Sequence, residues 1–200
     1  PDWLWREGVI PGYDHSDGKP VWLIYSGNEP RADRDNVGLL DISTFSKFLL
    51  QGRDAERIIN YVFTNNMAVA SGRIVYTQWL NEQGGISADL TVTRLAKDAY
   101  LVMTAFSSHT RDYNWLQRHI PSDAHAVLTD VTPSYAGINV QGPNSRVLLQ
   151  QVSPDNFSNS AFPFGTSKEI QLGYATIRAS RISYVGELGW ELLIPSDMAA

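Results

Sequence analysis

The chain contains 200 residues, of which 43% are hydrophobic and 18% charged, with a formal net charge of −5 and no cysteine. This is enough apolar sequence to bury the core of one domain or of two small ones. The acidic balance excludes a general attraction to nucleic acid, and the lack of cysteine excludes disulfides, thiolate metal sites and cysteine nucleophiles. Because there is no run of about 18 apolar residues and no signal-peptide pattern, the sequence predicts neither a membrane span nor secretion.

The amino-terminal part, residues 1–36, is expected to form an irregular arm. It is rich in Trp, Pro, Gly and Asp and contains one short predicted strand at 21–25. A polar helix is predicted from 29 to 40. Residues 37–200 are expected to form a domain that is truncated at its carboxyl end, because the closing sequence PSDMAA resembles the opening of a helix that is not completed.

The rest of the chain mixes helical patterns with strand patterns. Helices are predicted at 54–63, at 108–119, and after the sequence QGP, where Pro143 is expected in the first helical turn. Strands are predicted at 46–51, 73–80, 86–95, 99–104, 126–132, 135–140, 168–172, 174–183 and 190–195. Because hairpins replace regular βαβ units, the predicted fold class is α+β, with mixed, largely antiparallel sheets and packed helices.

The strand predicted at 86–95 has two faces of different polarity. Apolar residues occupy its even positions from 86 to 92, and Ser, Asp or Thr occupy its odd positions from 87 to 93. Asp89 therefore points away from the apolar face. If the hairpin loop has four residues, Tyr76 lies directly opposite Asp89, and if it has five, Tyr76 is a diagonal neighbour. The same pattern is also typical of a solvated sheet face.

A second polar cluster follows from the sequence YVGELGWELLIP at 184–195. Its glycines predict a sharp turn that enters a strand, with Glu187 and Glu191 flanking Trp190. An ionised carboxylate offers two coplanar acceptor oxygens, so carboxylates beside a Trp can bind a flat heterocycle with adjacent N–H donors. A surface hairpin with solvated glutamates would give the same pattern.

Other familiar sites are not indicated. The four histidines have no metal-ligand spacing, so no metal site is predicted. The sequence contains no GxGxxG, Walker A or GxSxG motif, so this chain offers no recognisable dinucleotide, nucleotide-triphosphate or serine-hydrolase site.

In four sequence blocks, the chain resembles the folate-binding aminomethyltransferase family typified by the glycine-cleavage T-protein. The blocks occur in the family's order: VGLLDISTFSKF (37–48), GRIVYTQWLNEQGGISADLTVTRL (72–95), INVQGPNSRVLL (138–149) and SRISYVGELGWELLIP (180–195). The resemblance is closer to the folate-binding half of dimethylglycine and sarcosine dehydrogenases. The T-protein usually has two consecutive acidic residues where this chain has Ala88 and Asp89, which also favours the dehydrogenase branch.

The resemblance implies a tetrahydrofolate pocket and a role for particular residues. Asp89 stands at the family's catalytic aspartate, Tyr76 at its folate-contacting tyrosine, and Glu191 at the glutamate that hydrogen-bonds the pterin. Three further residues of the same blocks are expected to contribute to cofactor binding: Thr91, Tyr184 and Glu187.

The implied function is the capture of a one-carbon unit from an N-methyl amine of the dimethylglycine, sarcosine or glycine type as 5,10-methylenetetrahydrofolate. FAD would belong to an amino-terminal domain outside this sequence. Two alternatives stay open: a stand-alone T-protein-like transferase or folate-dependent demethylase, and a non-catalytic folate-binding regulator. The expected partners are a folate and an amine donor rather than nucleic acid or membrane. The expected location is the cytoplasm or the mitochondrial matrix, and the sequence does not predict the oligomeric state.

Overall fold

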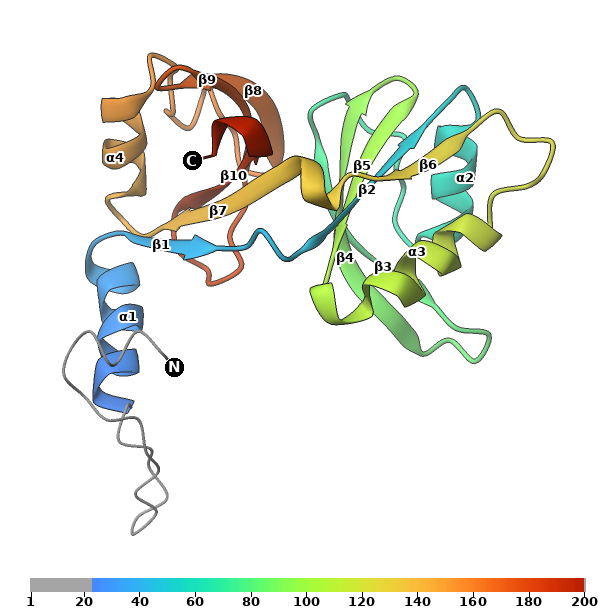
Figure 1. Cartoon of the computed structure of the whole chain (residues 1–200), viewed down its shortest axis with the longest axis horizontal. Helices are drawn as coiled ribbons and strands as arrows, with labels where there is room; N and C mark the ends of the chain where they lie inside the picture. Colours follow the sequence, from blue (N-terminus) through green and yellow to red (C-terminus); the bar gives the residue numbers. More distant parts are fainter. Residues whose placement is uncertain (1–22, 200) are drawn as a thin grey trace, which may run out of the picture.

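The computed structural model describes residues 23–199, which form two five-stranded antiparallel sheets that lie side by side (Figure 1). We call the first the β7 sheet; its strands, in spatial order, are β1 (Gly38–Asp41), β7 (Tyr135–Gln141), β10 (Gly189–Pro195), β9 (Ala175–Arg181) and β8 (Thr166–Leu172). We call the second the β4 sheet; its strands are β3 (Ile74–Leu80), β4 (Ile86–Ala96), β5 (Ala99–Thr104), β2 (Ser46–Gln51) and β6 (Val127–Asp130). The predicted α+β class with largely antiparallel sheets is confirmed.

Four helices accompany the sheets: α1 (Leu23–Asp35), α2 (Ala55–Val62), α3 (His109–Arg118) and α4 (Ser145–Val152). Helices α2 and α3 pack on one face of the β4 sheet, and α4 packs beside the β7 sheet (Figure 1). Short 3₁₀ turns at 106–108, 132–134 and 196–198 complete the described chain.

Each sheet has its own apolar core, because strand alternation sends every second side chain toward the helices. In the β4 sheet, the fully buried Trp79 packs with strand residues such as Leu90 and Val92 and with residues of α2 and α3. In the β7 sheet, the fully buried Trp190 packs with Phe157, Phe162 and residues of α4. The opposite face of each sheet is therefore the face that remains for polar residues.

The chain passes between the sheets twice, from β1 to β2 and from β6 to β7 (Figure 1). The two sheets also join where β3 and β8 begin. There, Arg73 and Thr166 form an isolated antiparallel bridge, and the Ser167 amide donates to the Gly72 carbonyl at 2.7 Å. The two sheets are therefore joined both by the chain crossings and by backbone hydrogen bonds.

The structure corrects the prediction for the region before β2. Residues 23–25 belong to α1, so the predicted strand at 21–25 is wrong over its described part, and residues 21–22 lie outside the described residues. The predicted helix is confirmed only from 29 to 35, because Gly38–Asp41 pairs with β7 as a strand instead. The segment GLLD has no β-branched or aromatic residue, and it is a strand because a partner strand is available, which local sequence does not reveal.

Three smaller details also differ. Pro143 precedes α4, whose N-cap is Asn144, so the proline is not in the first helical turn. Ile86 is 70% exposed, because the register shifts between Trp79 and Leu80 at the end of the hairpin. The closing segment forms a 3₁₀ turn, and the Ser196 hydroxyl donates to the Pro133 carbonyl rather than capping a helix.

Candidate functional site

The hairpin of β3 and β4 brings Tyr76 to Asp89. Tyr76 pairs with Thr91, and Asp89 pairs with Gln78, so the tyrosine is a diagonal neighbour of Asp89, the second of the two predicted arrangements. The hairpin reaches it with a five-residue loop and a register shift between Trp79 and Leu80. The Tyr76 hydroxyl donates to Asp89 Oδ2 at 2.7 Å. This hydrogen bond raises the pKa of Tyr76, because it stabilises the neutral phenol beside a carboxylate. Asp89 lies within strand β4, and both side chains are exposed, so the carboxylate is accessible from solvent.

The same face of the β4 sheet continues inward to a buried lysine. In-register pairing sets Tyr76, Thr91, Met103 and Lys47 in one row across β3, β4, β5 and β2. Exposure decreases along this row from 58% at Tyr76 to 0% at Lys47. The predicted residues Tyr76 and Thr91 therefore share a surface with Lys47, which the sequence did not single out.

Lys47 is an ammonium group fixed inside the protein. Its Nζ donates to the carbonyl oxygens of Ser43 at 3.0 Å and Phe45 at 2.9 Å. Burial lowers the pKa of Lys47, and the charges of Asp130, Asp41 and Glu191 oppose that change. A lysine can be buried in this way because hydrogen bonds satisfy two of its three donors and the charges of carboxylates favour its ionised form.

The β7 sheet presents a second polar row. Glu191 on β10 lies between Asn139 on β7 and Ser180 on β9, and Ser180 in turn pairs with Ser167 on β8. Glu191 itself is half-buried, and the other three side chains are buried. Burial raises the pKa of Glu191 to about 7, an effect that the positive charge of Lys47 opposes. The reading of Glu191 as a solvated glutamate is therefore wrong.

Two buried amides extend this row. Gln141, which is 0% exposed, donates from Nε2 to Asn139 Oδ1. Its Oε1 has no hydrogen-bond partner among residues 23–199. A Cβ at Gly189 would meet the end of the Gln141 side chain, so the amide would have to move if residue 189 were larger than glycine. The β7 sheet thus carries several acceptor oxygens on one surface: Glu191, Asn139 and Gln141.

The loop after β9 holds the remaining predicted residues. Gly186 has a φ of +82°, which confirms the predicted sharp turn. Tyr184 is 89% exposed, and it lies near enough to Tyr76 for its charge to contribute to the raised pKa of that residue. Glu187 forms an ion pair with Arg34 of α1 at 3.2 Å and lines a cavity of about 260 Å³. The structure therefore joins Tyr76 to Asp89 on the β4 sheet, where Thr91 lies in the same row as Tyr76. It places Glu191 on the other sheet, the β7 sheet.

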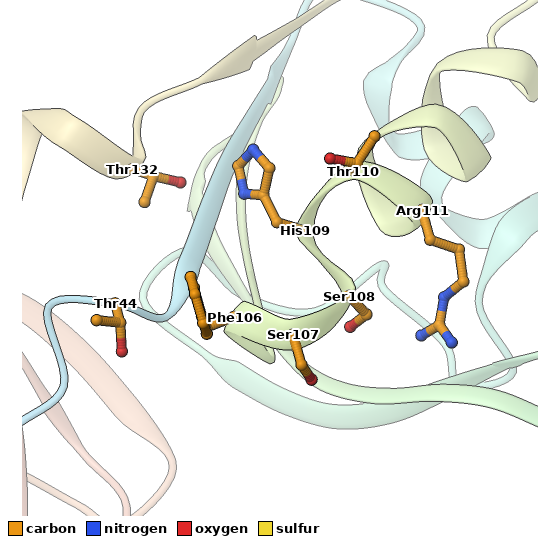
Figure 2. Close-up of a pocket in the computed structure, with 8 residues that line it drawn as sticks. All are labelled: Thr44, Phe106, Ser107, Ser108, His109, Thr110, Arg111 and Thr132. Carbon is orange, nitrogen blue, oxygen red and sulfur yellow. The ribbon is translucent and has the colours of Figure 1, made fainter.

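A larger cavity, of about 510 Å³, lies at the start of α3 (Figure 2). Its lining comes from the β1–β2 connection, the turn after β6 and residues 106–111: Thr44, Phe106, Ser107, Ser108, His109, Thr110, Arg111 and Thr132. None of the sequence-predicted site residues lines it. The predicted site therefore lies elsewhere, along the two polar rows.

One contact chain beside this cavity contains Ser, His and Asp. The Ser46 hydroxyl lies 2.8 Å from His109 Nδ1, and His109 Nε2 lies 3.2 Å from Asp130 Oδ2. In a catalytic triad the serine contacts Nε2 and the aspartate contacts Nδ1, so the ring is used here in the opposite sense. Ser46 is also 0% exposed, so it cannot meet a substrate. These contacts join α3 to β2 and β6.

The described part of the chain contains neither a metal-ligand cluster nor a membrane-spanning helix. Within residues 23–199, no three His, Cys, Asp or Glu side chains are grouped so that they could hold a metal ion. In the same range, no helix is long and apolar enough to cross a membrane.

Sequence reasoning missed Lys47, Asn139 and Gln141. Lys47 carried a readable signal, because it alternates with the apolar residues Phe48 and Leu50, so its charge faces the side opposite the core. The two amides carried a weaker signal, since Asn and Gln within a strand are equally compatible with an exposed edge.

The fold is that of the class of protein that the sequence blocks indicated. The family profile of the GCVT N-terminal domain matches residues 9–200. The chain belongs to this family, whose members are aminomethyltransferase-like folate-binding domains.

Three curated relatives are longer proteins. The chain is 39% identical over 200 residues to 4-methylaminobutanoate oxidase (formaldehyde-forming) of Paenarthrobacter nicotinovorans, covering 99% of the chain and 24% of the relative. It is 37% identical to human mitochondrial sarcosine dehydrogenase (82% and 19% covered) and 32% identical to the mouse mitochondrial pyruvate dehydrogenase phosphatase regulatory subunit (90% and 21% covered). The chain therefore spans about a quarter or less of the length of these relatives.

A solved structure supports the fold. The glycine cleavage system aminomethyltransferase T from Bartonella henselae superimposes with a TM-score of 0.76, covering 97% of this chain and 52% of that protein. Their sequence identity is 21%, so this likeness concerns the fold alone.

Proposed function

We propose that these residues form the tetrahydrofolate-binding transferase part of an N-methyl amine dehydrogenase or oxidase, with Asp89 as the catalytic base. The observation that carries the proposal is the hydrogen bond from the Tyr76 hydroxyl to Asp89 Oδ2 on the polar face of the β4 sheet. One carboxylate oxygen is thereby oriented, and a carboxylate has a second oxygen with which to accept a proton.

The second polar row fits the folate. A pterin presents adjacent N–H donors along one edge, and the β7 sheet offers the carboxylate of Glu191 and the Oε1 of the buried Gln141, which has no partner among residues 23–199. A buried acceptor without a partner is costly unless a ligand supplies a donor. We assign Glu191 to the pterin edge, and Tyr76, Thr91 and Tyr184 to contacts around the ring. Glu187 is the more peripheral member, because Arg34 already pairs with it.

When bound, tetrahydrofolate supplies two amine nitrogens that accept a one-carbon unit at the formaldehyde oxidation level. From formaldehyde, the balanced reaction gives 5,10-methylenetetrahydrofolate and water. From the iminium ion of an N-methyl amine, it gives the same product, the demethylated amine and one proton. In both cases an amine N–H must lose its proton, and we assign Asp89 to accept it. Its negative charge also stabilises cationic character on the one-carbon unit.

The amine oxidation itself would require a flavin. None of the described residues is assigned to FAD, because no dinucleotide motif is present in this sequence. We therefore assign the amine oxidation to a flavin outside these 200 residues, and no role proposed for Asp89 or Glu191 depends on that flavin.

The test is a paired assay on the complete gene product. With an N-methyl amine as substrate, formaldehyde and 5,10-methylenetetrahydrofolate are measured with and without tetrahydrofolate. We expect tetrahydrofolate to divert product from formaldehyde to methylenetetrahydrofolate in the wild-type protein and not in Asp89→Asn. Equal formaldehyde release in all conditions would contradict the proposal.

A regulatory role is the second candidate, because one relative is a phosphatase regulatory subunit. This candidate predicts folate binding without turnover, and no change of reaction products in Asp89→Asn. A third candidate, a T-protein-like transferase, predicts transfer from an aminomethyl donor without any amine oxidation. The same assay, repeated with an aminomethyl donor, separates the three.

A further inference from the structure

The two sheets are built in the same way (Figure 1). The first repeat is β2–α2–β3–β4–β5, and the second repeat is β7–α4–β8–β9–β10. Each sheet is completed by a short strand that precedes the first strand of the other repeat: β6 lies beside β2, and β1 lies beside β7. Positions of one repeat can therefore be compared with the equivalent positions of the other.

Arg94 of β4 and Arg181 of β9 are equivalent residues. Each accepts at its backbone carbonyl from the amide of a glycine with positive φ, at 2.7 and 2.8 Å respectively. Each donates from Nη1 to a backbone carbonyl of the segment between the helix and the next strand, at 2.8 and 2.7 Å. Each guanidinium lies over an aromatic ring of the following strand: Arg94 is 5.5 Å from the centre of Tyr100, and Arg181 is 5.6 Å from the centre of Trp190.

The helices of the two repeats carry opposite charges at one equivalent position. Helices α2 and α4 each have eight residues and begin three residues after the glycine of a Gln-Gly pair. Glu56 is the second residue of α2, and Arg146 is the second residue of α4. In the first repeat, Glu56 Oε2 pairs with Arg94 Nη2 at 2.6 Å and accepts from the Tyr100 hydroxyl at 3.3 Å. One carboxylate thus serves both the arginine and the aromatic donor.

The second repeat lacks this carboxylate. Arg146 has its guanidinium carbon 5.8 Å from the centre of the Trp190 ring, so two guanidinium groups lie near one indole. Among residues 23–199, neither Arg146 nor Arg181 forms an ion pair. Arg181 Nε and Trp190 Nε1 are buried and have no hydrogen-bond partner in the same range. Burial, and then the charge of Arg146, lower the pKa of Arg181. The donors that Glu56 serves in the first repeat therefore have no acceptor in the second.

Neutral oxygens hold the two guanidinium groups without cancelling their charge. Arg146 donates from Nε to the Phe157 carbonyl at 2.8 Å and from Nη2 to Asn159 Oδ1 at 2.7 Å. Both arginines are partly exposed, and Arg181 lines the cavity of about 260 Å³. Glu187 lines the same cavity, and its ion pair is with Arg34. The cavity therefore gives a ligand access to a positive charge that no carboxylate of the described chain pairs with.

We propose that Arg146 and Arg181 form a binding site for a ligand carboxylate, which takes the place that the Glu56 carboxylate takes in the first repeat. A carboxylate matches the fork of a guanidinium group with two oxygens, and the equivalent position already uses this chemistry. A buried donor without a partner is costly, and a bound anion removes that cost. The site goes beyond the proposed function and does not depend on it, because Trp190 and Glu191 point to opposite faces of β10.

The test is arginine modification by phenylglyoxal in the complete gene product, with each modified residue identified by mass spectrometry. The probe is malonate, and sodium chloride at the same ionic strength controls for screening. If the Kd is about 10 mM, malonate at about 20 mM lowers the rate of modification of a bound arginine about threefold. We expect this protection at Arg146 and Arg181. We expect none at Arg57 of α2, whose side chain is 61% exposed.

The two repeats supply reciprocal variants. Arg146→Glu supplies the second repeat with the carboxylate of the first, so we expect Arg181 to react slowly whether or not malonate is present. Glu56→Arg removes the carboxylate from the first repeat, so we expect malonate to protect Arg94 in this variant and not in the wild-type protein. Arg146→Gln removes one charge without supplying an acceptor, so Arg181 should stay reactive and lose most of its protection.

Several outcomes would overturn the inference. Equal protection by sodium chloride and malonate would show screening alone, and protection by inorganic phosphate but not by malonate would exclude a carboxylate as the ligand. Malonate protection of Arg181 that persists fully in folded Arg146→Glu and Arg146→Gln would exclude Arg146 from the site. If Glu187→Gln accelerates the modification of Arg181 as strongly as Arg146→Glu slows it, Glu187 already serves as the acceptor and no ligand is required.

Discussion

Two carboxylates of this protein occupy opposite kinds of environment. Asp89 lies on the exposed part of the β4 sheet, and its partner is a neutral phenol at 2.7 Å. Glu191 lies in the β7 sheet, where burial raises its pKa to about 7 and a buried lysine opposes that rise. The comparison shows how one fold can separate two tasks, since an exposed carboxylate can exchange protons with a substrate while a half-buried one discriminates between ligands by their hydrogen-bond donors.

The largest expected effect comes from the exposed carboxylate. Asp89→Asn keeps the shape of the side chain and removes the base, so we expect turnover of folate-dependent transfer to fall by about 10² to 10⁴-fold. Folate affinity should change by less than about threefold. Steady-state kinetics measures the turnover, and calorimetric titration measures the affinity. If Asp89→Asn loses affinity as strongly as turnover, Asp89 serves in folate binding, the role assigned to Glu191.

Substitution of Glu191, the half-buried carboxylate, should weaken folate binding more than it lowers turnover. Glu191→Gln removes a charge-assisted acceptor worth about 1.5 to 3 kcal/mol, so we expect folate to bind about 10 to 100-fold more weakly. The chemical step at saturating folate should be less affected than in Asp89→Asn. Calorimetry at pH 8, where Glu191 is mostly ionised, gives the largest difference. Wild-type affinity in this variant would mean that the pterin edge is bound elsewhere.

The raised pKa of Glu191 predicts a pH dependence of stability. Between its ordinary value near 4.5 and about 7, the folded protein binds more protons at this site than the unfolded chain does. The free energy of unfolding should therefore fall as pH increases through this window, by on the order of 1 to 3 kcal/mol for this group. Urea unfolding at pH 5 and pH 8 should show this fall in the wild-type protein. It should be smaller in Glu191→Gln, which we expect to be the more stable of the two at pH 8.

A smaller effect is expected from the phenol. Tyr76→Phe removes the hydroxyl that orients Asp89 and leaves the ring in place, so we expect turnover to fall by about three- to tenfold, in line with about 1 kcal/mol for one hydrogen bond. Because both groups are exposed, the unfolding free energy should change by less than about 0.5 kcal/mol. The rate is compared with that of Asp89→Asn; if the double variant falls no further than Asp89→Asn alone, the tyrosine acts through the aspartate.

The smallest effect is expected at Glu187. Its partner Arg34 is largely exposed, and exposed ion pairs contribute little. Glu187→Gln should therefore alter stability by less than about 0.5 kcal/mol and folate affinity by less than about threefold. An affinity loss as large as that of Glu191→Gln would move the pterin site toward the loop after β9.

Much of this protein was readable from its sequence. Alternation of polar and apolar residues determined the meander of β3, β4 and β5 and the outward direction of Asp89, because the side-chain period of a strand is two residues. Four motif blocks were sufficient to indicate the family. The residues Asp89, Tyr76 and Glu191 came from those blocks, and their proposed roles remain predictions.

Only the tertiary structure decided the rest. Gly38–Asp41 became a strand because β7 offers it a partner, and the diagonal placement of Tyr76 depended on a register shift at the end of the hairpin. The unequal environments of Asp89 and Glu191 arise from their places in two different sheets, where one carboxylate is exposed and the other is half-buried. Lys47 and Glu191 are 144 positions apart in the sequence, and no local pattern links them. Burial and charge proximity are properties of the packed molecule, so the pKa of Glu191 could not be inferred from its neighbours in the chain.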